Sequence, residues 1–271
     1  MKEFRHKVCV ITGAGSGIGR ALALDLAVRG ARLAISDVNA DTVAETAAEA
    51  VQLGAEVEHY VLDVSSREAV FAHADEVVAR FGTANLVINN AGVAMAKTVL
   101  EMPIEDIEWL MGINFWGVVY GTKAFLPHLI ASGDGHLVNI SSVFGIIAVP
   151  TQAAYNAAKF AVRGFTEALR QEALVEGYPI RVSCVHPGGV RTNIARAARS
   201  DTATPDELGE AFDRLARTTP EKAAATILAG VRRGSPKILV GPDARAIDLM
   251  QRTLGATYQR IVYRASKLNP S

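Results

Sequence analysis

Cysteine and histidine are scarce in this chain of 271 residues, which has two cysteines and six histidines. Cys9 and Cys184 each lie inside a short apolar run typical of a buried strand, so we expect two buried thiols. In the Rossmann-type sheet predicted below, their strands would be three strand spacings apart, about 14 Å, which is too far for a disulfide. No cluster of cysteines and histidines has the spacing of zinc ligands, so we expect no metal site and no zinc chemistry.

The sequence also lacks an excess charge, a long apolar run and a linker. Lys plus Arg equals Asp plus Glu, at 28 each, so the chain has no basic surplus for a nucleic acid. No apolar run approaches the roughly 18 residues that span a bilayer, and residues 1–7 lack the apolar core of a signal peptide. We therefore expect a cytoplasmic protein with one domain in residues 1–240 and an extension of it in residues 241–271.

What the sequence does contain is a regular alternation of β-branched runs and helical periodicities. This pattern predicts an α/β fold, with a doubly wound, seven-stranded parallel sheet of the Rossmann type and helices on both faces. The predicted strands are 8–12, 32–37, 56–62, 86–89, 136–140, 180–186 and 237–240. The predicted helices are 18–29, 41–53, 67–81, 104–129, 151–175, 205–217 and 220–233.

A glycine-rich turn joins the first predicted strand to the first predicted helix, with the sequence TGAGSGIG at residues 12–19. Glycines allow a tight turn and a close approach to a ligand, and the free amides at a helix start favour a pyrophosphate. The spacing G-x-x-x-G-x-G differs from the dinucleotide fingerprint G-x-G-x-x-G. The turn is either a phosphate site or a tight corner without a ligand, and its candidate contacts are Gly13, Ser16, Gly17, Ile18 and Gly19.

Acidic residues end the second and third predicted strands. Asp37 can accept hydrogen bonds from both hydroxyls of an adenosine ribose and would repel a 2′-phosphate, which predicts NAD over NADP. Ser16 and Val38 supply no cation for such a phosphate. Asp63, followed by Val64, either meets the adenine or caps the next helix; Asp37 has the same alternative as a turn or cap residue.

Polar residues also follow the fourth predicted strand. Asn90, Ala91 and Gly92 stand where backbone contacts with a cofactor are expected, although Asn89 and Asn90 could instead join neighbouring strands. Asn114 lies within an apolar helical stretch, where an amide without partners costs about 1–3 kcal/mol. Asn114 either makes structural hydrogen bonds or contributes its amide to an active site.

The candidate catalytic residues follow the fifth predicted strand. Ser142 stands 13 residues before Tyr155, and Lys159 lies one helical turn after Tyr155. Residues i and i+4 share a helix face, so a cation there can lower the pKa of a phenol from its usual value of about 10. Tyr155 and Lys159 on a solvated helix face would be the alternative.

The sixth predicted strand ends at His186, before a Pro-Gly-Gly turn. Its backbone amides suit a carboxamide, and the candidate contacts are Pro187, Gly188, Val190 and Thr192. His186 could be a general base, but a lone histidine before such a turn is typically structural.

Taken together, these motifs resemble the short-chain dehydrogenase/reductase family in its single-domain form, over residues 5–240. The resemblance implies that Tyr155 exchanges a proton with the substrate oxygen and that Ser142 hydrogen bonds that oxygen. It implies that Lys159 lowers the pKa of Tyr155 and binds the nicotinamide ribose, and that Asn114 positions a water behind Lys159. The cofactor contacts that it implies include Asp37, Tyr155 and Lys159.

The expected function is therefore hydride transfer between NAD(H) and a secondary alcohol or ketone. Apolar segments at 93–95, 143–147 and 194–195 predict a lipophilic substrate. One alternative is a catalytically silent NAD-binding sensor or scaffold of the same fold. Another is a nucleotide-sugar epimerase or dehydratase, for which too little chain follows Val190.

The chain departs from the family after its seventh predicted strand. Many members end near an Asp-Gly-Gly turn in a tetramer interface, whereas this chain continues, so a homodimer is as well supported as a homotetramer. The extension predicts a basic amphipathic helix. We expect it to pack on its own domain or on a second subunit, with contact to a membrane surface as the less favoured alternative. Its apolar residues are Ala244, Ile247, Met250, Leu254, Tyr258, Ile261 and Val262, and its basic residues are Arg245, Arg252, Arg260, Arg264 and Lys267.

Overall fold

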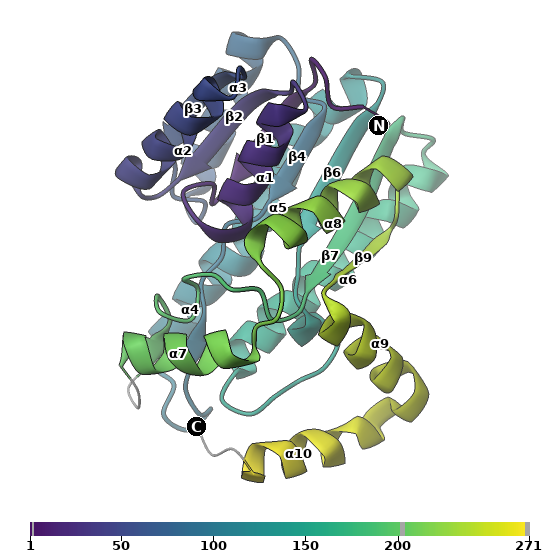
Figure 1. Ribbon diagram of the computed structural model, residues 1–271. Helices are drawn as coiled ribbons and strands as arrows, with labels where there is room; N and C mark the ends of the chain where they lie inside the picture. The colour runs from purple at the N-terminus through teal and green to yellow at the C-terminus, as the bar shows by residue number, and fades with distance from the viewer. Residues whose placement is uncertain (2, 201–203, 269–271) are drawn as a thin grey trace.

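A seven-stranded parallel sheet forms the centre of the computed structural model, which describes Met1, residues 3–200 and residues 204–268 (Figure 1). The strand order is β3-β2-β1-β4-β6-β7-β9. The chain therefore runs outward in one direction from β1 and in the other from β4, and a crevice is expected at their carboxyl ends. The strands are β1 (Val8–Thr12), β2 (Arg32–Asp37), β3 (Glu56–Val61), β4 (Leu86–Asn89), β6 (Gly135–Ile140), β7 (Ile180–Pro187) and β9 (Lys237–Val240).

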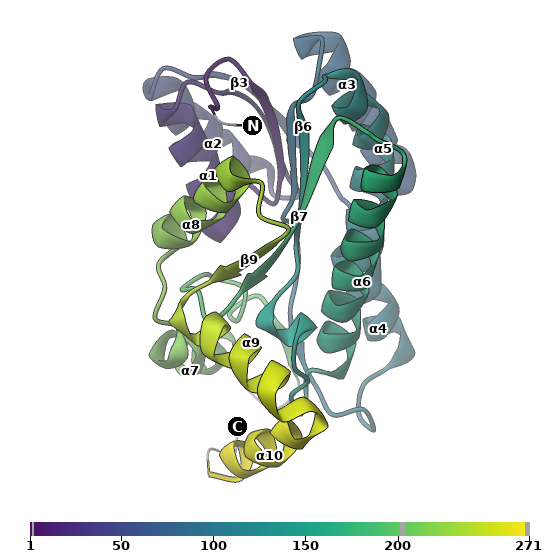
Figure 2. The ribbon, with the colours of Figure 1, turned by 90° about the vertical axis from the view of Figure 1, so that its right-hand side faces the viewer.

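Helices cover both faces of this sheet (Figure 2). One layer consists of α1 (Gly17–Val28), α2 (Ala40–Gln52) and α8 (Pro220–Arg233), and the other of α3 (Arg67–Phe81), α5 (Gly117–Ala131) and α6 (Ala153–Val175). Beyond the carboxyl ends of the strands lie α4 (Ile104–Met111), α7 (Pro205–Leu215), α9 (Pro242–Leu254) and α10 (Tyr258–Leu268). The doubly wound fold predicted from the sequence is confirmed.

The core follows from the two-residue period of the strands. Cys9 and Ile11 of β1 belong to the cluster under α1 and α8, whereas Val8 and Val10 belong to the cluster under α3 and α5. All five residues of β1 are buried, as expected for a central parallel strand with both faces covered. Burying each large aliphatic side chain contributes about 1.5–3 kcal/mol, so the two clusters fix the register of the central strands.

The predicted elements differ from the structure mainly at one helix. The periodicity predicted a single helix over residues 104–129, but the structure divides this stretch into α4, a π-helix at Gly112–Trp116 and α5. The inserted residue widens the turn around Asn114, whose amide finds its partners on the loop after β4. Elsewhere the ends of the elements shift by one or two residues, as for α6, which begins at Ala153 rather than at residue 151.

The extension after β9 forms two helices, α9 and α10, joined by a 3-10 turn at Gly255–Thr257. Its apolar side packs on its own domain, because Tyr258 is buried and Val262, Ile247 and Met250 join the same cluster. Ile261 and Tyr263 remain about half exposed. Packing on the same domain, which the sequence offered as one alternative, is therefore present in this structure.

Cys9 and Cys184 are buried and free. Their strands are separated by β4 and β6 in the sheet, as the sequence predicted. Within residues 3–200 and 204–268, no group of three His, Cys, Asp or Glu side chains could hold a metal ion. Nor does any helix in the described part of the chain have the length and apolar character to cross a membrane.

We predict that acidification destabilises the fold through its buried histidines. His73 lies between the rings of Tyr60 and Phe125, at centroid distances of 4.5 and 5.9 Å, and burial lowers its pKa to about 4. The unfolded state binds a proton near pH 6.5 and the folded state does not, so the free energy of unfolding falls as the pH drops from 6.5 towards 4. At about 1.4 kcal/mol per pKa unit, the protonation of His73 accounts for a loss of roughly 3 kcal/mol in the free energy of unfolding.

Urea unfolding of His73→Phe at pH 7 and pH 4.5 measures this effect. Between pH 7 and pH 4.5, the free energy of unfolding of the variant is expected to fall by about 2–3 kcal/mol less than that of the wild type. His59→Phe is the matched control, because His59 lies exposed on neighbouring β3. An equal loss in wild type and His73→Phe would contradict the prediction.

Candidate active site

The glycine-rich turn has a shape that only glycine allows. Gly13 and Gly17 have φ values of 66° and 52°, in the left-handed region. A Cβ on Gly19 would lie 2.0 Å from the carbonyl oxygen of Gly13, so the start of α1 packs directly against the turn. The N-cap residue of α1, Ser16, is exposed and makes no side-chain cap, whereas α2 and α3 are capped by Asn39 and Ser66. The first amides of α1 are thus suited to an anionic ligand.

Asp37 lies beside this turn, at the end of β2. Its Oδ2 accepts a hydrogen bond from the Gly15 amide at 2.9 Å, and its Oδ1 accepts one from the Asn39 amide at 3.0 Å. The structure therefore brings together the turn and the carboxylate that the sequence proposed as its partner. The same bonds also show that Asp37 shapes the turn, which was the alternative interpretation.

Asn89 and Asn90 join neighbouring strands, as one alternative from the sequence proposed. The Asn89 amide donates to Asn139 Oδ1 at 2.8 Å, and the Asn90 amide donates to the carbonyl oxygens of Thr12 and Gly13 at 2.9 and 3.1 Å. The Asn90 and Ala91 backbone amides donate to Thr12 Oγ1. This network fixes the distance between the ends of β1 and β4, where the strand order reverses.

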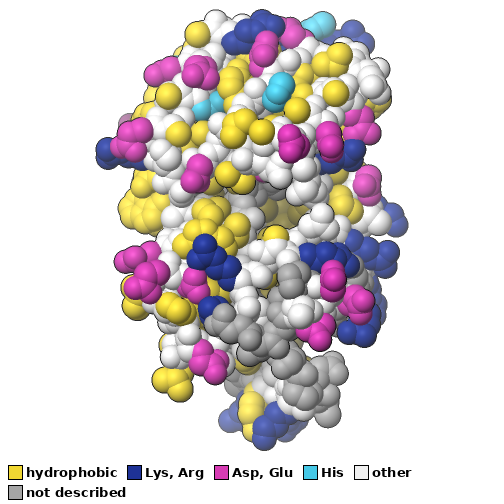
Figure 3. All heavy atoms as spheres, turned by 90° about the vertical axis from the view of Figure 1, so that its left-hand side faces the viewer, with side chains coloured by type: hydrophobic (Ala, Val, Ile, Leu, Met, Phe, Trp, Pro, Cys, Tyr) yellow, Lys and Arg dark blue, Asp and Glu magenta, His cyan; other side chains and the backbone are white. Residues whose placement is uncertain are grey.

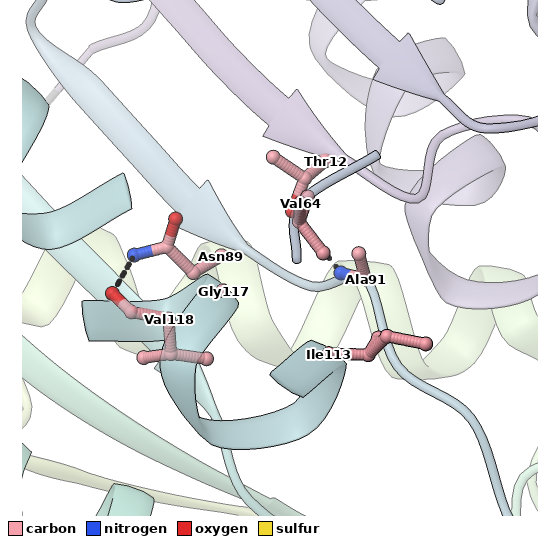
Figure 4. Close-up of a pocket in the computed structure, with 7 residues that line it drawn as sticks. All are labelled: Thr12, Val64, Asn89, Ala91, Ile113, Gly117 and Val118. Atoms are coloured by element: carbon pink, nitrogen blue, oxygen red, sulfur yellow. Dashed lines mark hydrogen bonds between the residues drawn. The ribbon is translucent and has the colours of Figure 1, made fainter. Parts of the chain in front are cut away.

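A small pocket opens at this reversal point (Figure 4). Thr12 and Ala91 line it from the ends of β1 and β4, Val64 lines it from the loop after β3, and Ile113 lines it from the π-helix. The other lining residues are Asn89, Gly117 and Val118. Asp63, just before Val64, accepts bonds from the Ser65 amide and hydroxyl, so it stabilises the turn before α3.

The Pro-Gly-Gly turn after β7 lies against the glycine-rich turn. A Cβ on Gly17 would lie 2.9 Å from Thr192 Cγ2, which brings the two turns side by side. The Gly188 amide donates to the Val240 carbonyl oxygen at 2.9 Å, and the Gly189 amide donates to Asp243 Oδ2 at 2.6 Å. Sequence reasoning missed Asp243, which anchors this turn from the start of α9.

Pro187 and Val190 flank this turn. Pro187 is the last residue of β7 and pairs with Val240 of β9, and Val190 forms an isolated bridge with Thr218. Both residues are therefore held by backbone pairing on either side of the two glycines.

Ser142, Tyr155 and Lys159 meet at the carboxyl end of β6. Ser142 lies close enough to the Tyr155 phenol to influence its pKa. Lys159 Nζ lies 5.5 Å from the centre of the Tyr155 ring and donates to the Ile140 carbonyl oxygen at 3.1 Å. The Ser141 hydroxyl donates to the Lys159 carbonyl oxygen at 2.8 Å. The structure therefore brings together the three residues that the sequence singled out.

The pKa values differ from the expectation for this triad. Burial raises the pKa of Tyr155 to about 12, and the hydrogen bond with Ser142 opposes this increase. Burial also lowers the pKa of the Lys159 ammonium to about 8. Desolvation disfavours the charged form of both groups, so the phenol is protonated at pH 7. Burial dominates the pKa of Tyr155, and the expected lowering of this pKa by Lys159 is not seen.

Asn114 lies in the π-helix and is fully buried. Its Oδ1 accepts from the Val93 amide and its Nδ2 donates to the Val93 carbonyl oxygen, both at 2.8 Å. A Cβ on Gly92 would lie 3.1 Å from Asn114 Oδ1 and 3.6 Å from Lys159 Nζ. Asn114 therefore makes structural hydrogen bonds, and it also stands close to Lys159.

His186 is structural. Its Nδ1 lies 3.0 Å from the Ser142 carbonyl oxygen, and burial lowers its pKa to about 4. Neutral Nδ1–H is therefore the donor to this carbonyl at neutral pH. His186 supports the backbone of Ser142 from β7.

Sequence reasoning also missed Asn156, the neighbour of Tyr155. Its Nδ2 donates to the carbonyl oxygens of Phe144 and Ile147, and its Oδ1 accepts from the Val149 amide. A polar residue on the buried side of an amphipathic helix was the available signal, the same signal that identified Asn114.

Apolar side chains surround Tyr155. Phe144 meets its ring edge-on at a centroid distance of 6.1 Å, and Val93, Met95 and Trp109 belong to the cluster against which Tyr155 packs. Figure 3 shows a hollow in the middle of one face of the molecule, with hydrophobic side chains around its rim. The phenol thus stands in an apolar environment.

The segment after β7 contacts β5 and α4. Its short strand β8 (Arg199–Ser200) pairs with β5 (Met95–Ala96). Arg199 forms an ion pair with Asp106 at 2.7 Å and lies 3.6 Å above the centre of the Trp109 ring. These contacts tie the segment to α4.

Comparison with known proteins agrees with this geometry. A family model for short chain dehydrogenases matches residues 7–203. The chain belongs to the short-chain dehydrogenase family. Its curated relatives include SadH of Mycobacterium tuberculosis, described as an oxidoreductase, which is 58% identical over 97% of this chain and 96% of its own length. The C alpha-dehydrogenase of a Sphingobium species is 36% identical over 90% of this chain and 84% of its own length.

Solved structures of short-chain dehydrogenases share the fold. One from Burkholderia phymatum, crystallised in complex with NAD, superposes with a TM-score of 0.87 at 31% identity, over 93% of this chain and 95% of its own. As a short-chain dehydrogenase, the present chain is an oxidoreductase.

We predict that Gly145→Ala damages this site. A Cβ on Gly145 would lie 2.3 Å from Ser141 Oγ and 2.7 Å from the Lys159 carbonyl oxygen, so the turn after Ser142 must move away from α6. Overpacking of this kind costs about 1–3 kcal/mol, and the displacement should lower kcat roughly tenfold or more. Thermal unfolding and steady-state kinetics measure the two effects.

Gly164→Ala on α6 is the matched control, because a Cβ there would meet nothing within 4 Å. Replacing this helical glycine should stabilise the fold by up to about 1 kcal/mol and leave kcat unchanged. A Gly145→Ala variant with wild-type kcat would show that the contact between the turn and α6 does not position the site.

Proposed function

We propose that this short-chain dehydrogenase is an NAD-dependent enzyme that interconverts a secondary alcohol and a ketone, with Tyr155 as the acid/base. The observation that carries the proposal is the meeting of Tyr155 and Lys159 next to Ser142 at the end of β6, where the Lys159 Nζ lies 5.5 Å from the centre of the phenol ring and donates to the Ile140 carbonyl oxygen. These groups lie at the carboxyl edge of the sheet, where dinucleotides bind in such folds.

The proposed cofactor is NAD, which accepts or supplies the hydride through its nicotinamide ring. The left-handed glycines of the turn, the uncapped start of α1 and the carboxylate of Asp37 fit a dinucleotide with free ribose hydroxyls. Related short-chain dehydrogenases from Burkholderia phymatum and Mycobacterium paratuberculosis were crystallised with NAD. The pyrophosphate would be held at Gly13, Ser16, Gly17, Ile18 and Gly19, and the other cofactor contacts would be Asp37, Asp63, Val64, Asn90, Ala91, Gly92, Tyr155, Lys159, Pro187, Gly188, Val190 and Thr192.

In the proposed oxidation, Tyr155 removes the hydroxyl proton of the alcohol as the carbon gives up its hydride. Ser142 donates a hydrogen bond to the same substrate oxygen and keeps it beside the phenol. In reduction, Tyr155 returns the proton to the carbonyl oxygen. Lys159 would hold a ribose hydroxyl of the cofactor and would pass protons from the phenol to a water near Asn114. Proton transfer and hydride transfer together balance the reaction.

The proposed substrate is lipophilic. Phe144 contacts the Tyr155 ring, and Val93 and Trp109 pack on the same apolar cluster as Tyr155. Burying an apolar substrate on this surface contributes about 25 cal/mol per Å². Polar substituents would lose their water without gaining partners.

The absorbance of NADH tests the proposal directly. Purified chain is mixed with NAD or NADP and a series of secondary alcohols from 2-propanol to 2-decanol, with xylitol as the polar comparison. We expect NADH formation with NAD, and kcat/KM values that rise with chain length. Binding of NADH without turnover of any alcohol would favour a silent sensor, and a preference for xylitol would contradict the lipophilic substrate.

We further propose that the enzyme is a homo-oligomer. Trp116, in the π-helix before α5, is 47% exposed, and Phe160, on α6, is 40% exposed. Trp116 stacks on Tyr120 at a centroid distance of 5.8 Å. An exposed aromatic surface of this kind suits an interface between two copies. Light scattering after size exclusion measures the mass, and a monomer would contradict the proposal.

A further inference from the structure

The loop that connects Ser142 to Tyr155 is held from two opposite sides. From α6, Asn156 makes three hydrogen bonds to its backbone, at 2.8, 3.0 and 3.2 Å. From the extension, the Tyr258 hydroxyl accepts a hydrogen bond from the Ala148 amide at 2.9 Å. Residues 110 positions apart in the chain therefore meet at this loop.

Tyr258 is the buried residue at the start of α10, where the extension contacts the domain. It is only 7% exposed, whereas Tyr263 on the same helix is 57% exposed. Its ring packs with Ile146 and Ile147 of the loop, which are 2% and 4% exposed. Around these three lie Phe144, Val149, Leu239, Ile247, Met250 and Val262.

This cluster is continuous with the catalytic residues. Phe144 belongs to it and also contacts the ring of Tyr155. The Phe144 amide donates to Ser142 Oγ at 3.1 Å, and the Gly145 amide donates to the Ser142 carbonyl oxygen at 3.0 Å. A shift of the loop therefore moves both the hydroxyl of Ser142 and the apolar wall beside the phenol.

The Tyr258 hydroxyl supplies a hydrogen-bond acceptor that a phenylalanine at this position would lack. The Ala148 amide is partly buried and needs an acceptor, and a buried amide without one costs about 1–3 kcal/mol. Without the phenol oxygen, the loop would have to move to let water reach this amide. The hydroxyl therefore fixes the loop, while the ring seals it from solvent.

We propose that Tyr258 is a positioning residue for the oxidoreductase reaction, acting from the C-terminal extension through the loop between Ser142 and Tyr155. The inference rests on the proposed function, because it assigns the loop to the active site. The extension thereby completes the catalytic site of its own subunit.

Tyr258→Phe and its matched control Tyr263→Phe test the proposal, each in the full-length chain. Steady-state kinetics with NAD and the best alcohol of the series should give a kcat about tenfold lower for Tyr258→Phe and unchanged for Tyr263→Phe. Fluorescence titration with NADH should give the wild-type number of sites and a dissociation constant within threefold for both. A parallel loss of kcat and of NADH sites would show a merely structural role and overturn the proposal, as would unchanged kcat.

Amide hydrogen exchange supplies a readout that does not depend on activity. In Tyr258→Phe, peptides covering residues 143–151 should exchange at least tenfold faster, while peptides around Asp37 keep wild-type rates. Equal exchange of the loop in wild type and variant would refute the positioning role. If the wild type turns over no alcohol, the proposed function fails, and the exchange rates alone decide whether Tyr258 holds the loop.

Discussion

Tyr155→Phe should lower kcat by about 10²- to 10⁴-fold, the usual contribution of a positioned acid or base. The substitution removes one oxygen and keeps the ring that contacts Phe144. NADH binding should stay within threefold of the wild type, because the glycine-rich turn and Asp37 lie on the other side of the strand reversal. Steady-state kinetics and fluorescence titration give the two numbers.

Tyr178→Phe is the control for this variant, since Tyr178 is 37% exposed and lies after α6. It should leave kcat unchanged. If Tyr155→Phe keeps the wild-type kcat, the phenol is not the acid/base of the reaction, and Tyr155 contributes only through packing. Equal losses of kcat and NADH binding would mean that the phenol oxygen acts through cofactor binding or through the fold, and not as the acid/base of the reaction.

The pKa values define what the cofactor must contribute. A phenol with a pKa raised to about 12 by burial suits the acid of ketone reduction, because it is protonated at neutral pH. As the base of alcohol oxidation it needs a lower pKa. Oxidised NAD carries a positive charge on its nicotinamide ring, and a positive charge near the phenol favours the phenolate. Binding of the oxidised cofactor would thus prepare the base.

The sequence predicted the parts of this site that depend on local spacing. Tyr155 and Lys159 share a helix face, and the glycine turn follows a buried strand; both properties are determined by neighbours along the chain. The parallel strand order followed because alternating strands and helices permit few connections. The meeting of Ser142 with Tyr155 was implied by the resemblance to the short-chain dehydrogenase/reductase family, because a separation of 13 residues permits this contact but does not require it.

Features that depend on distant parts of the chain were not predictable in this way. The π-helix around Asn114 changes the period of a helix by one residue, and its reason lies in Val93 on another loop. Asp243 and Tyr258 act on turns that precede them by more than 50 and 100 residues, respectively. The raised pKa of Tyr155 depends on burial, which local spacing does not specify.

Asp37→Asn should change the cofactor preference more than any other single substitution at the glycine-rich turn. The carboxylate faces the turn through its bond with the Gly15 amide, where a ribose 2′-phosphate would meet its charge. Two unit charges 4 Å apart repel by about 1 kcal/mol even in bulk water, and a phosphate carries nearly two charges. The ratio of kcat/KM for NAD to that for NADP should therefore fall at least about 30-fold.

Asp41→Asn is the matched control, because Asp41 is an exposed carboxylate in the first turn of α2, close in sequence to Asp37. It removes the same charge from the same region, so its ratio should change less than threefold. Raising the ionic strength should improve the use of NADP by the wild type, because salt screens the repulsion, and should have little effect on Asp37→Asn. An unchanged ratio in Asp37→Asn would assign Asp37 to the shape of the turn alone, and the preference for NAD would then have to arise from steric exclusion rather than from charge.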